Sequence, residues 1–383
     1  MSILEAGKTV LKGVYAIHKL APTHKNRIAI ISRQSNQPSV DIRLLKEELD
    51  RRGNLDVRVL CKTLDSGIAG KLGYMFHMLG PQMHAIATSK VVVLDSYCIA
   101  VSILKHKKDL KVIQMWHAMG ALKKFGRSIL GQEEGSSEKL AEAMDMHKGY
   151  DYILASSQAS IPYFAEAFGY PEDRFRVLPL PRTDLLKDGA YQAEQKNKIL
   201  ESHPELSGRK IVLYAPTMRK TEDDITKPLA LADAAQAYPD WTLVISPHPV
   251  MHQQYEDKRE VFESKGALFL PAYSTMELLS LCDAVITDYS AVVYEAAAAE
   301  KPIYLFAYDL QQYEGSRGFY LDYQTDMPVQ PLSAASDVME CVAAGRCSQG
   351  AVKAFADKFI TMPSERCTAV LAEGIVRKMA ENQ

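Results

Sequence analysis

The sequence of 383 residues has few of the features that direct a chain out of a cell or through a membrane. Its six cysteines form no CxxC pair and have no metal-ligand spacing with histidine, so we expect reduced thiols and no metal site. No apolar run approaches the roughly 18–20 residues that a membrane-spanning helix needs. The N-terminus lacks the compact apolar segment of a secretory signal. These absences predict a cytoplasmic chain that meets a membrane, if at all, from its surface.

Net charge is also nearly absent, since 45 Lys and Arg stand against 47 Asp and Glu. This balance excludes a general nucleic-acid binder. The positive charge is unevenly placed, however. Residues 1–30 carry five basic residues against one acidic residue, and residues 101–130 carry seven against one. Such clusters are either solvated faces or surfaces that meet the phosphates of a lipid or a substrate.

Short apolar runs that alternate with helical patterns dominate the rest of the chain. Strands are predicted over residues 26–32, 56–61, 91–95, 111–116, 151–156 and 174–180, and again over 210–216, 241–247, 267–271, 283–288 and 301–306. Strands that alternate with helices are typical of parallel sheets covered on both faces. Because the length suits two domains, we predict an α/β protein of two Rossmann-like domains that face each other across a cleft.

The domain limits follow from composition. An amphipathic basic helix is expected within residues 1–24, an N-terminal Rossmann-like domain over 25–185 and a C-terminal one over 205–383. An alternative for the C-terminal helix is that it crosses back and packs on the N-terminal domain. No GxGxxG and no P-loop is present, which argues against a dinucleotide oxidoreductase and a P-loop ATPase.

Polar side chains follow several predicted strands, at the edge where parallel sheets bind ligands. Any single hydroxyl there can simply cap the next helix, but several such clusters together predict one polar cleft. A helix start and arginines suit a diphosphate, and a histidine can take a proton from an attacking hydroxyl. The chemistry favours transfer to or from a phosphorylated donor. The residues are His117, Arg182, Thr217, Arg219, His248, Thr287, Asp288 and Ser290.

Longer motifs carry a resemblance to a known family. They are QMWHAMGALKKFG (114–126), FAEAFGY (164–170), PRTD (181–184), LYAPTMR (213–219), SPHP (246–249), ITDYSAVVYE (286–295) and YEGSRGFYLDY (313–323). In this order they resemble the CDP-glycerol glycerophosphotransferase family, the primases and polymerases of wall teichoic acid. The resemblance implies a GT-B fold and peripheral attachment to the cytoplasmic face of the cell membrane. It also implies transfer of glycerol phosphate, or ribitol phosphate in some members, from a CDP-activated donor to a polyprenyl-linked acceptor, without a cofactor.

The resemblance also implies residue roles. His117 would be the general base for the acceptor hydroxyl, and His248 would contact the donor phosphates or the departing CMP. The remaining residues would bind the substrate: Thr287, Asp288 and Ser290 at the diphosphate with Arg182 and Arg219 near it, Glu295 at the ribose, Arg317 as a further phosphate contact, and Thr217 as a further substrate-binding residue. The chain departs from the usual family residues at Ala118, Pro179 and Ala291. Ala291 stands where the family usually has a serine, so one hydroxyl that could bind the donor phosphate is missing and the identity of the donor is not fixed by the motifs.

The compact length and basic N-terminal helix resemble the primases, which add the first glycerol phosphate to a disaccharide on undecaprenyl diphosphate. We therefore expect a CDP-glycerol-dependent primase. The alternatives are a poly(glycerol or ribitol phosphate) polymerase of the same family, a GT-B glycosyltransferase or epimerase that uses a UDP-sugar, and a catalytically silent scaffold.

Contact with an anionic membrane surface is expected from the helix over 2–20, the apolar segment 67–83 and the basic run 105–108. Segment 67–83 is alternatively a buried helix. The oligomeric state stays open.

Overall fold

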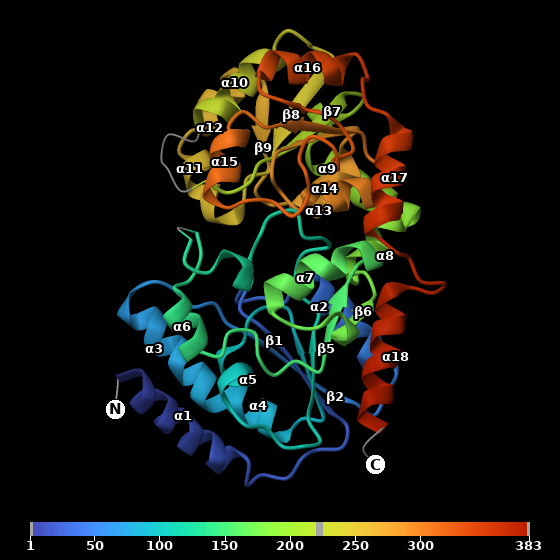
Figure 1. Ribbon diagram of the computed structural model, residues 1–383. Coiled ribbons are helices and arrows are strands. Elements are labelled where there is room, and N and C mark those ends of the chain that lie inside the picture. The colour runs from blue at the N-terminus through green and yellow to red at the C-terminus, as the bar shows by residue number, and fades with distance from the viewer. Residues whose placement is uncertain (1–2, 133, 220–224, 381–383) are drawn as a thin grey trace. The chain divides into compact units, whose positions relative to one another are not determined.

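A computed structural model describes residues 3–132, 134–219 and 225–380. The chain forms two compact units, which we call the first and the second unit. The first unit comprises Met1–Met119, Lys124–Asp184 and Thr361–Gln383, and the second comprises Gly120–Lys123 and Leu185–Ile360. Each unit has its own parallel sheet of six strands with helices packed on it (Figure 1). The α/β prediction is confirmed.

The sheet of the first unit has the order β2-β1-β3-β4-β5-β6. Its strands are β1 (Arg27–Ser32), β2 (Asp56–Cys61), β3 (Val91–Leu94), β4 (Lys111–Gln114), β5 (Tyr152–Ala155) and β6 (Phe175–Val177). The central strand β3 is an unbroken, fully buried VVVL run, as expected for a strand covered on both faces. The helices of this unit are α1 (Ile3–His18), α2 (Val40–Arg51), α3 (Gly67–His77), α4 (Met83–Thr88), α5 (Ile99–Ile103), α6 (Glu138–Ala143), α7 (Ile161–Phe168) and α18 (Cys367–Ala380).

The sheet of the second unit has the order β12-β11-β10-β7-β8-β9. Its strands are β7 (Lys210–Ala215), β8 (Trp241–Ile245), β9 (Ala267–Phe269), β10 (Ala284–Thr287), β11 (Ile303–Phe306) and β12 (Pro331–Leu332). The helices are α9 (Gly189–Ser202), α10 (Thr226–Ala235), α11 (His252–Glu256), α12 (Arg259–Ser264), α13 (Thr275–Leu281), α14 (Val292–Ala298), α15 (Leu310–Ser316), α16 (Ala335–Ala343) and α17 (Gln349–Phe359), while α8 (Arg182–Lys187) crosses the boundary between the units.

Two segments belong to a different unit from their neighbours in the sequence, and for the last helix this is the crossing that the sequence analysis allowed. The C-terminal helix α18 belongs to the first unit, where it packs on α2. The carboxylate of Asp184 accepts hydrogen bonds from the backbone N–H groups of Cys367 (2.7 Å) and Thr368 (3.0 Å) and so caps the start of α18. The segment Gly120–Lys123 belongs to the second unit, although the sequence around it is part of the first.

The expected helix over 67–83 is interrupted. After α3 the chain forms a wider π-helical turn over Met78–Gln82, which contains Pro81, and then continues as α4. Proline has no N–H to donate, so the regular α-helical ladder cannot pass through it. Among the described residues, no helix combines the length and the apolar character needed to cross a bilayer.

Candidate active site

His117 lies just beyond the carboxyl end of β4, as expected from the sequence. Gln114 accepts a hydrogen bond from the backbone N–H of Trp116 (3.0 Å), and Trp116 has a left-handed φ of 62° that turns the chain. His117 Nδ1 lies 2.8 Å from the backbone carbonyl oxygen of Asp95. The side-chain amide of Gln34 also lies near Nδ1, with Nε2 of Gln34 placed 3.2 Å away. A carbonyl only accepts, so the shorter contact with Asp95 places the proton on Nδ1 and leaves the lone pair of Nε2 available, and the Gln34 amide then turns its oxygen toward the ring.

The His117 ring is electrically neutral near pH 7. Burial lowers its pKa to about 4, against the smaller opposing effect of the Asp95 carbonyl. The positive charge of Arg182 lowers the pKa further. A neutral imidazole with an available Nε2 can accept a proton, which fits the general-base prediction for His117.

Arg182 is held beside His117 by a buried carboxylate. Its backbone N–H and its Nε donate to Asp41 at 2.8 and 2.9 Å, and Asp41 is only 1% exposed. The guanidinium also lies 3.4 Å from the carbonyl oxygen of His117. The first unit therefore brings two of the predicted residues together, with Asp41 fixing the orientation of Arg182.

A second buried carboxyl group adjoins the His117 turn. Asp95 accepts a hydrogen bond from Ser32 Oγ (2.8 Å) through Oδ2, while its Oδ1 is buried without a partner among the described residues. Burial raises the pKa of Asp95 to about 6. Sequence reasoning did not name Asp41 or Asp95 as part of this site, although Asp95 directly follows the buried run of β3.

In the second unit, Arg219 is the centre of a tight cluster. It pairs with Asp288 at 2.9 Å and with Asp309 at 3.1 Å. The rings of Tyr289, Tyr308 and Tyr313 lie 5.1–5.4 Å from its guanidinium carbon, within cation–π range. Among the described residues, the two carboxylates that pair with Arg219 offset the charge of its guanidinium.

Thr217, Thr287 and Asp288 meet around the same cluster. Asp288 accepts a hydrogen bond from the backbone N–H of Thr217 at 2.7 Å, and the Thr287 hydroxyl donates to the carbonyl of Ala215 at 2.8 Å. Both Thr287 and Asp288 are fully buried. These contacts hold the turn after β7 in place, and direct contact of either side chain with a donor stays a prediction.

The other predicted residues lie on neighbouring elements of the second unit. Ser290 lies just before α14, which begins at Val292, and its Oγ accepts from the backbone N–H of Val292 at 3.4 Å. Glu295 lies on α14, and Arg317 follows the last residue of α15. Their roles stay predictions.

His248 is exposed after β8, at the start of a short 3-10 turn, Pro249–Met251. Its Nδ1 accepts from the N–H of Val250 at 3.3 Å, so the neutral ring carries its proton on Nε2. Partial loss of hydration lowers the pKa of His248, and the positive charge of Lys123 lowers it further. His248 is thus arranged as a hydrogen-bond donor, whereas His117 is arranged as an acceptor.

Comparison with known proteins decides the family. Residues 14–376 match the family described as CDP-Glycerol:Poly(glycerophosphate) glycerophosphotransferase. The chain belongs to this family. It is 30% identical over 379 residues to the teichoic acid ribitol-phosphate primase of Bacillus spizizenii, a match that covers 96% of each chain. It is 29% identical over 248 residues to the teichoic acid glycerol-phosphate primase of Bacillus subtilis, covering 64% of this chain and 63% of that one.

Solved structures agree on the fold. The wall teichoic acid polymerase TagF superposes with a TM-score of 0.78 at 19% identity, covering 100% of this chain and 99% of that one. A UDP-GlcNAc 2-epimerase from Neisseria meningitidis superposes with a TM-score of 0.60 at 12% identity, covering 93% and 100%. These structures confirm the predicted GT-B-like α/β fold. With the family assignment, the chain is an enzyme of teichoic acid synthesis that transfers phosphate-linked groups.

Proposed function

We propose that the protein transfers a single polyol phosphate from a CDP-activated polyol to a lipid-linked disaccharide, releasing CMP and priming a teichoic acid chain. The main support for a primase is the match with a ribitol-phosphate primase, which covers 96% of both chains. The motifs led us to expect glycerol phosphate, and the family description agrees with a glycerol phosphate donor. The long match with the ribitol-phosphate primase supports ribitol phosphate instead, so the donor is left to the experiment below.

In this reaction, Nε2 of His117 takes the proton of the acceptor hydroxyl. The oxygen attacks the phosphorus that bears the polyol, a new P–O bond forms, and the P–O bond to CMP breaks. Such a transfer depends on positioning and on charge neutralisation more than on covalent chemistry. His117 is suited to the first step by its neutral ring and by the Nδ1 contact with Asp95.

The second unit would hold the donor. Because Asp288 and Asp309 already balance Arg219, the charge of the diphosphate must be met by other groups of this unit. His248 can donate from Nε2, and Lys123 lies close enough to lower its pKa. Lys123 also forms a β-bridge with Phe319, two residues beyond Arg317. We therefore infer that His248, Lys123 and Arg317 meet the donor phosphates, with Arg219 as the rigid support of the site.

Attachment to an anionic membrane surface is part of the same proposal. Helix α3 exposes Ile68, Leu72 and Phe76, which lie four residues apart and hence on one helical face. Helix α1 exposes Val10 and Ile17 and lies along the α3–α4 segment, where His18 Nε2 contacts the carbonyl oxygen of Leu79 at 2.7 Å (Figure 1). Exposed apolar side chains on basic amphipathic helices suit the interface of a bilayer.

Two residues of the basic run 105–108, Lys105 and Lys108, are exposed, whereas the other two contact α1 and the residues after it. Lys107 donates to the carbonyl oxygen of Ala21 at 2.6 Å, and a ring nitrogen of His106 lies 2.8 Å from Tyr15 Oη. Both side chains thereby tie the end of α1 and the residues after it to the rest of the first unit.

The alternative that segment 67–83 is a buried helix does not hold for its first part, since Tyr74 is the one buried residue of α3.

A polymerase is the second candidate. The chain is 30% identical over 337 residues to the teichoic acid poly(ribitol-phosphate) polymerase of Bacillus spizizenii, although it spans only 52% of that protein. A polymerase would add many units to one acceptor where a primase adds one.

The donor experiment uses the full chain with CDP-glycerol, CDP-ribitol or a UDP-sugar, and a synthetic lipid-linked disaccharide in detergent. We expect acceptor-dependent release of CMP from one of the two CDP-polyols, and a higher melting temperature with that donor but not with UDP. No CMP from either CDP-polyol would contradict the proposal. Protection by UDP alone would favour a UDP-sugar enzyme.

A further inference from the structure

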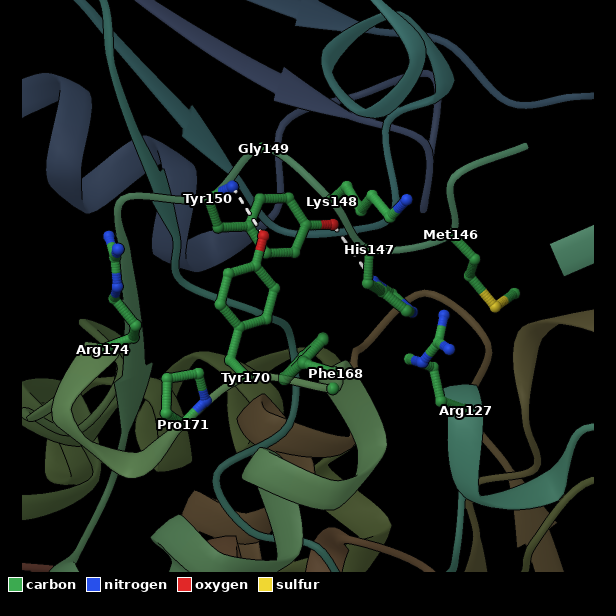
Figure 2. Close-up of a pocket in the computed structure, with 11 residues that line it drawn as sticks. Arg127, Met146, His147, Lys148, Gly149, Tyr150, Phe168, Tyr170, Pro171 and Arg174 are labelled. Atoms are coloured by element: carbon green, nitrogen blue, oxygen red, sulfur yellow. Dashed lines mark hydrogen bonds between the residues drawn. The ribbon is translucent and has the colours of Figure 1, made fainter. Parts of the chain in front are cut away.

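A pocket of about 660 Å³ lies in the first unit, apart from the Asp41–Arg182 pair. It is lined by the loop 146–150, by residues 168–171, and by Arg127 and Arg174 (Figure 2). This volume is in the range of pockets that hold small organic ligands. None of the roles proposed above uses this pocket.

Part of the pocket lining is aromatic. The rings of Tyr150 and Tyr170 are stacked, with 5.7 Å between centroids and 15° between planes. The Tyr170 hydroxyl accepts the backbone N–H of Tyr150 at 2.9 Å, and the Tyr150 hydroxyl lies 3.1 Å from Nδ1 of His147. Figure 2 shows these rings and Phe168 between Arg127 on one side and Arg174 on the other. Flat apolar faces with hydroxyls at their edges suit a carbohydrate or polyol body.

The charges of the pocket are positive and are not balanced within it. Its lining includes three cations, Arg127, Lys148 and Arg174, and no Asp or Glu. Lys148 pairs with Asp145 at 2.7 Å. Within the part of the chain that the structure describes, neither the Arg127 nor the Arg174 guanidinium has a hydrogen bond or an ion pair. Guanidinium groups in such surroundings favour a phosphate, which they bind through paired N–H donors.

The backbone around the pocket is built for close approach. Gly169 has a φ of +72°, and a Cβ atom there would lie 2.6 Å from Cδ of Arg127. Gly126 has a φ of +60°, and its Cβ would lie 2.5 Å from the carbonyl oxygen of Ala167. His147 also adopts a left-handed φ of 61°, which is uncommon for a residue with a side chain. These positions keep Arg127 packed against the end of α7.

The pocket is connected to His117 by one ring. The Trp116 ring centroid lies 5.1 Å from that of Phe168 and 6.1 Å from that of His147, both of which line the pocket. The Trp116 ring centroid also lies 4.1 Å from that of His117. A ligand in the pocket therefore contacts side chains that pack on the residue before the proposed base.

We propose that this pocket binds a phosphate ester of a polyol or sugar, with Arg174 at the phosphate, the Tyr150–Tyr170 stack at the carbon body, and Arg127 at the far end of that body, where its guanidinium donates to a hydroxyl. Polyol phosphates and sugar phosphates are both esters of this kind, and the experiment below distinguishes between them.

The proposed site lies in the first unit alone. It can therefore fail while CMP release succeeds, and the reverse.

The test measures binding by the fluorescence of Trp116. The chain has two tryptophans, so Trp241→Phe leaves Trp116 as the only one. Glycerol 3-phosphate and glucose 1-phosphate are titrated in parallel with inorganic phosphate and free glycerol. We expect saturable binding of at least one ester, tighter than that of inorganic phosphate, and the tighter ester identifies the source of the ligand. Inorganic phosphate binding as tightly as both esters would overturn the proposal.

Charge variants locate the site. Arg174→Gln and Arg127→Gln should each weaken binding of the ester about tenfold or more, because each removes a charge-assisted contact. Arg176→Gln is the matched control, since Arg176 is an exposed neighbour that bonds to the carbonyl of Asp173 and does not line the pocket. Arg174 is itself exposed, so its variant is expected to fold normally. Unchanged binding in a folded Arg174→Gln variant, or equal losses in Arg176→Gln, would overturn the proposal.

Discussion

His117 and Asp95 are joined by a 2.8 Å contact between the ring Nδ1 and the backbone carbonyl oxygen. This contact selects the tautomer in which Nε2 is unprotonated, and burial keeps the ring neutral. The contact is made by a backbone atom, so any residue at position 95 could supply it. The orientation of His117 therefore depends on the turn after β3 and not on the Asp95 side chain.

The pH dependence of turnover follows from the neutral ring. Only unprotonated His117 can act as a base, and burial lowers its pKa to about 4. We expect kcat/KM for the acceptor to stay level as the pH falls from 7 to about 5, and to decline through about pH 4.

His117→Gln should lose about a hundredfold or more in kcat while it still binds the CDP-polyol. His203→Gln, a change at a half-buried histidine of the second unit, is the control. An acid limb near pH 6.5 in the parent, or full activity of His117→Gln, would remove the assignment.

The Asp288–Arg219 pair should be important for stability. Asp288 is fully buried, and of the two acidic partners of Arg219 among the described residues, Asp288→Asn would leave Asp309. Loss of one partner of a buried pair costs about 3 kcal/mol of unfolding free energy. Urea unfolding measures this change. Glu194→Gln, which breaks the exposed Glu194–Lys198 pair, should leave the unfolding midpoint unchanged. Similar midpoints for both variants would show that the cluster is not a rigid support.

Acid should destabilise the fold through His147. Burial lowers the pKa of His147 from 6.5 to about 3, so between these values the unfolded chain binds a proton that the folded chain does not. Stability therefore falls as the pH falls, by about 2 kcal/mol between pH 7 and pH 5 from this residue. His147→Asn suits the left-handed backbone and should reduce that difference. Urea unfolding at both pH values measures it, with His203→Asn as control. An equal pH dependence in parent and His147→Asn would contradict the role of His147.

Membrane attachment should depend on the exposed face of α3. Phe76 is 69% exposed, and Phe76→Gln removes the apolar surface that we expect to enter the bilayer interface. Binding to vesicles that contain phosphatidylglycerol should fall about tenfold, as measured by flotation. Val250→Gln changes an equally exposed apolar residue of the second unit and should bind as the parent does. Equal binding of both variants would place the membrane contact elsewhere.

Sequence patterns predicted the strands well because they are short, apolar and local. The run predicted over 210–216 became β7 (Lys210–Ala215), and the run over 91–95 became β3 (Val91–Leu94). Strand β12 (Pro331–Leu332) was not predicted, because two residues carry no periodicity. The helix expected over 67–83 is interrupted at Pro81, because the apolar periodicity that predicts a helix does not report a missing backbone N–H.

The supporting residues of the site were harder to predict. Asp41 is 141 positions away from Arg182, and Asp309 is 90 positions away from Arg219. Such pairs arise from tertiary packing, which local patterns do not report. Asp288 does follow the end of β10, as the strand pattern predicted. Only the structure shows that its carboxylate accepts hydrogen bonds from the backbone N–H of Thr217 and from the guanidinium of Arg219.

Mass spectrometry of the product on a synthetic lipid-linked disaccharide tests the proposed function most directly. The full chain is incubated with excess CDP-glycerol or CDP-ribitol, and the mass of the lipid product is followed with time. We predict an increase of one polyol phosphate per acceptor, with no further growth and with no product from His117→Gln. A ladder of many units would show a polymerase, and an unchanged acceptor with both donors would contradict the proposed transfer.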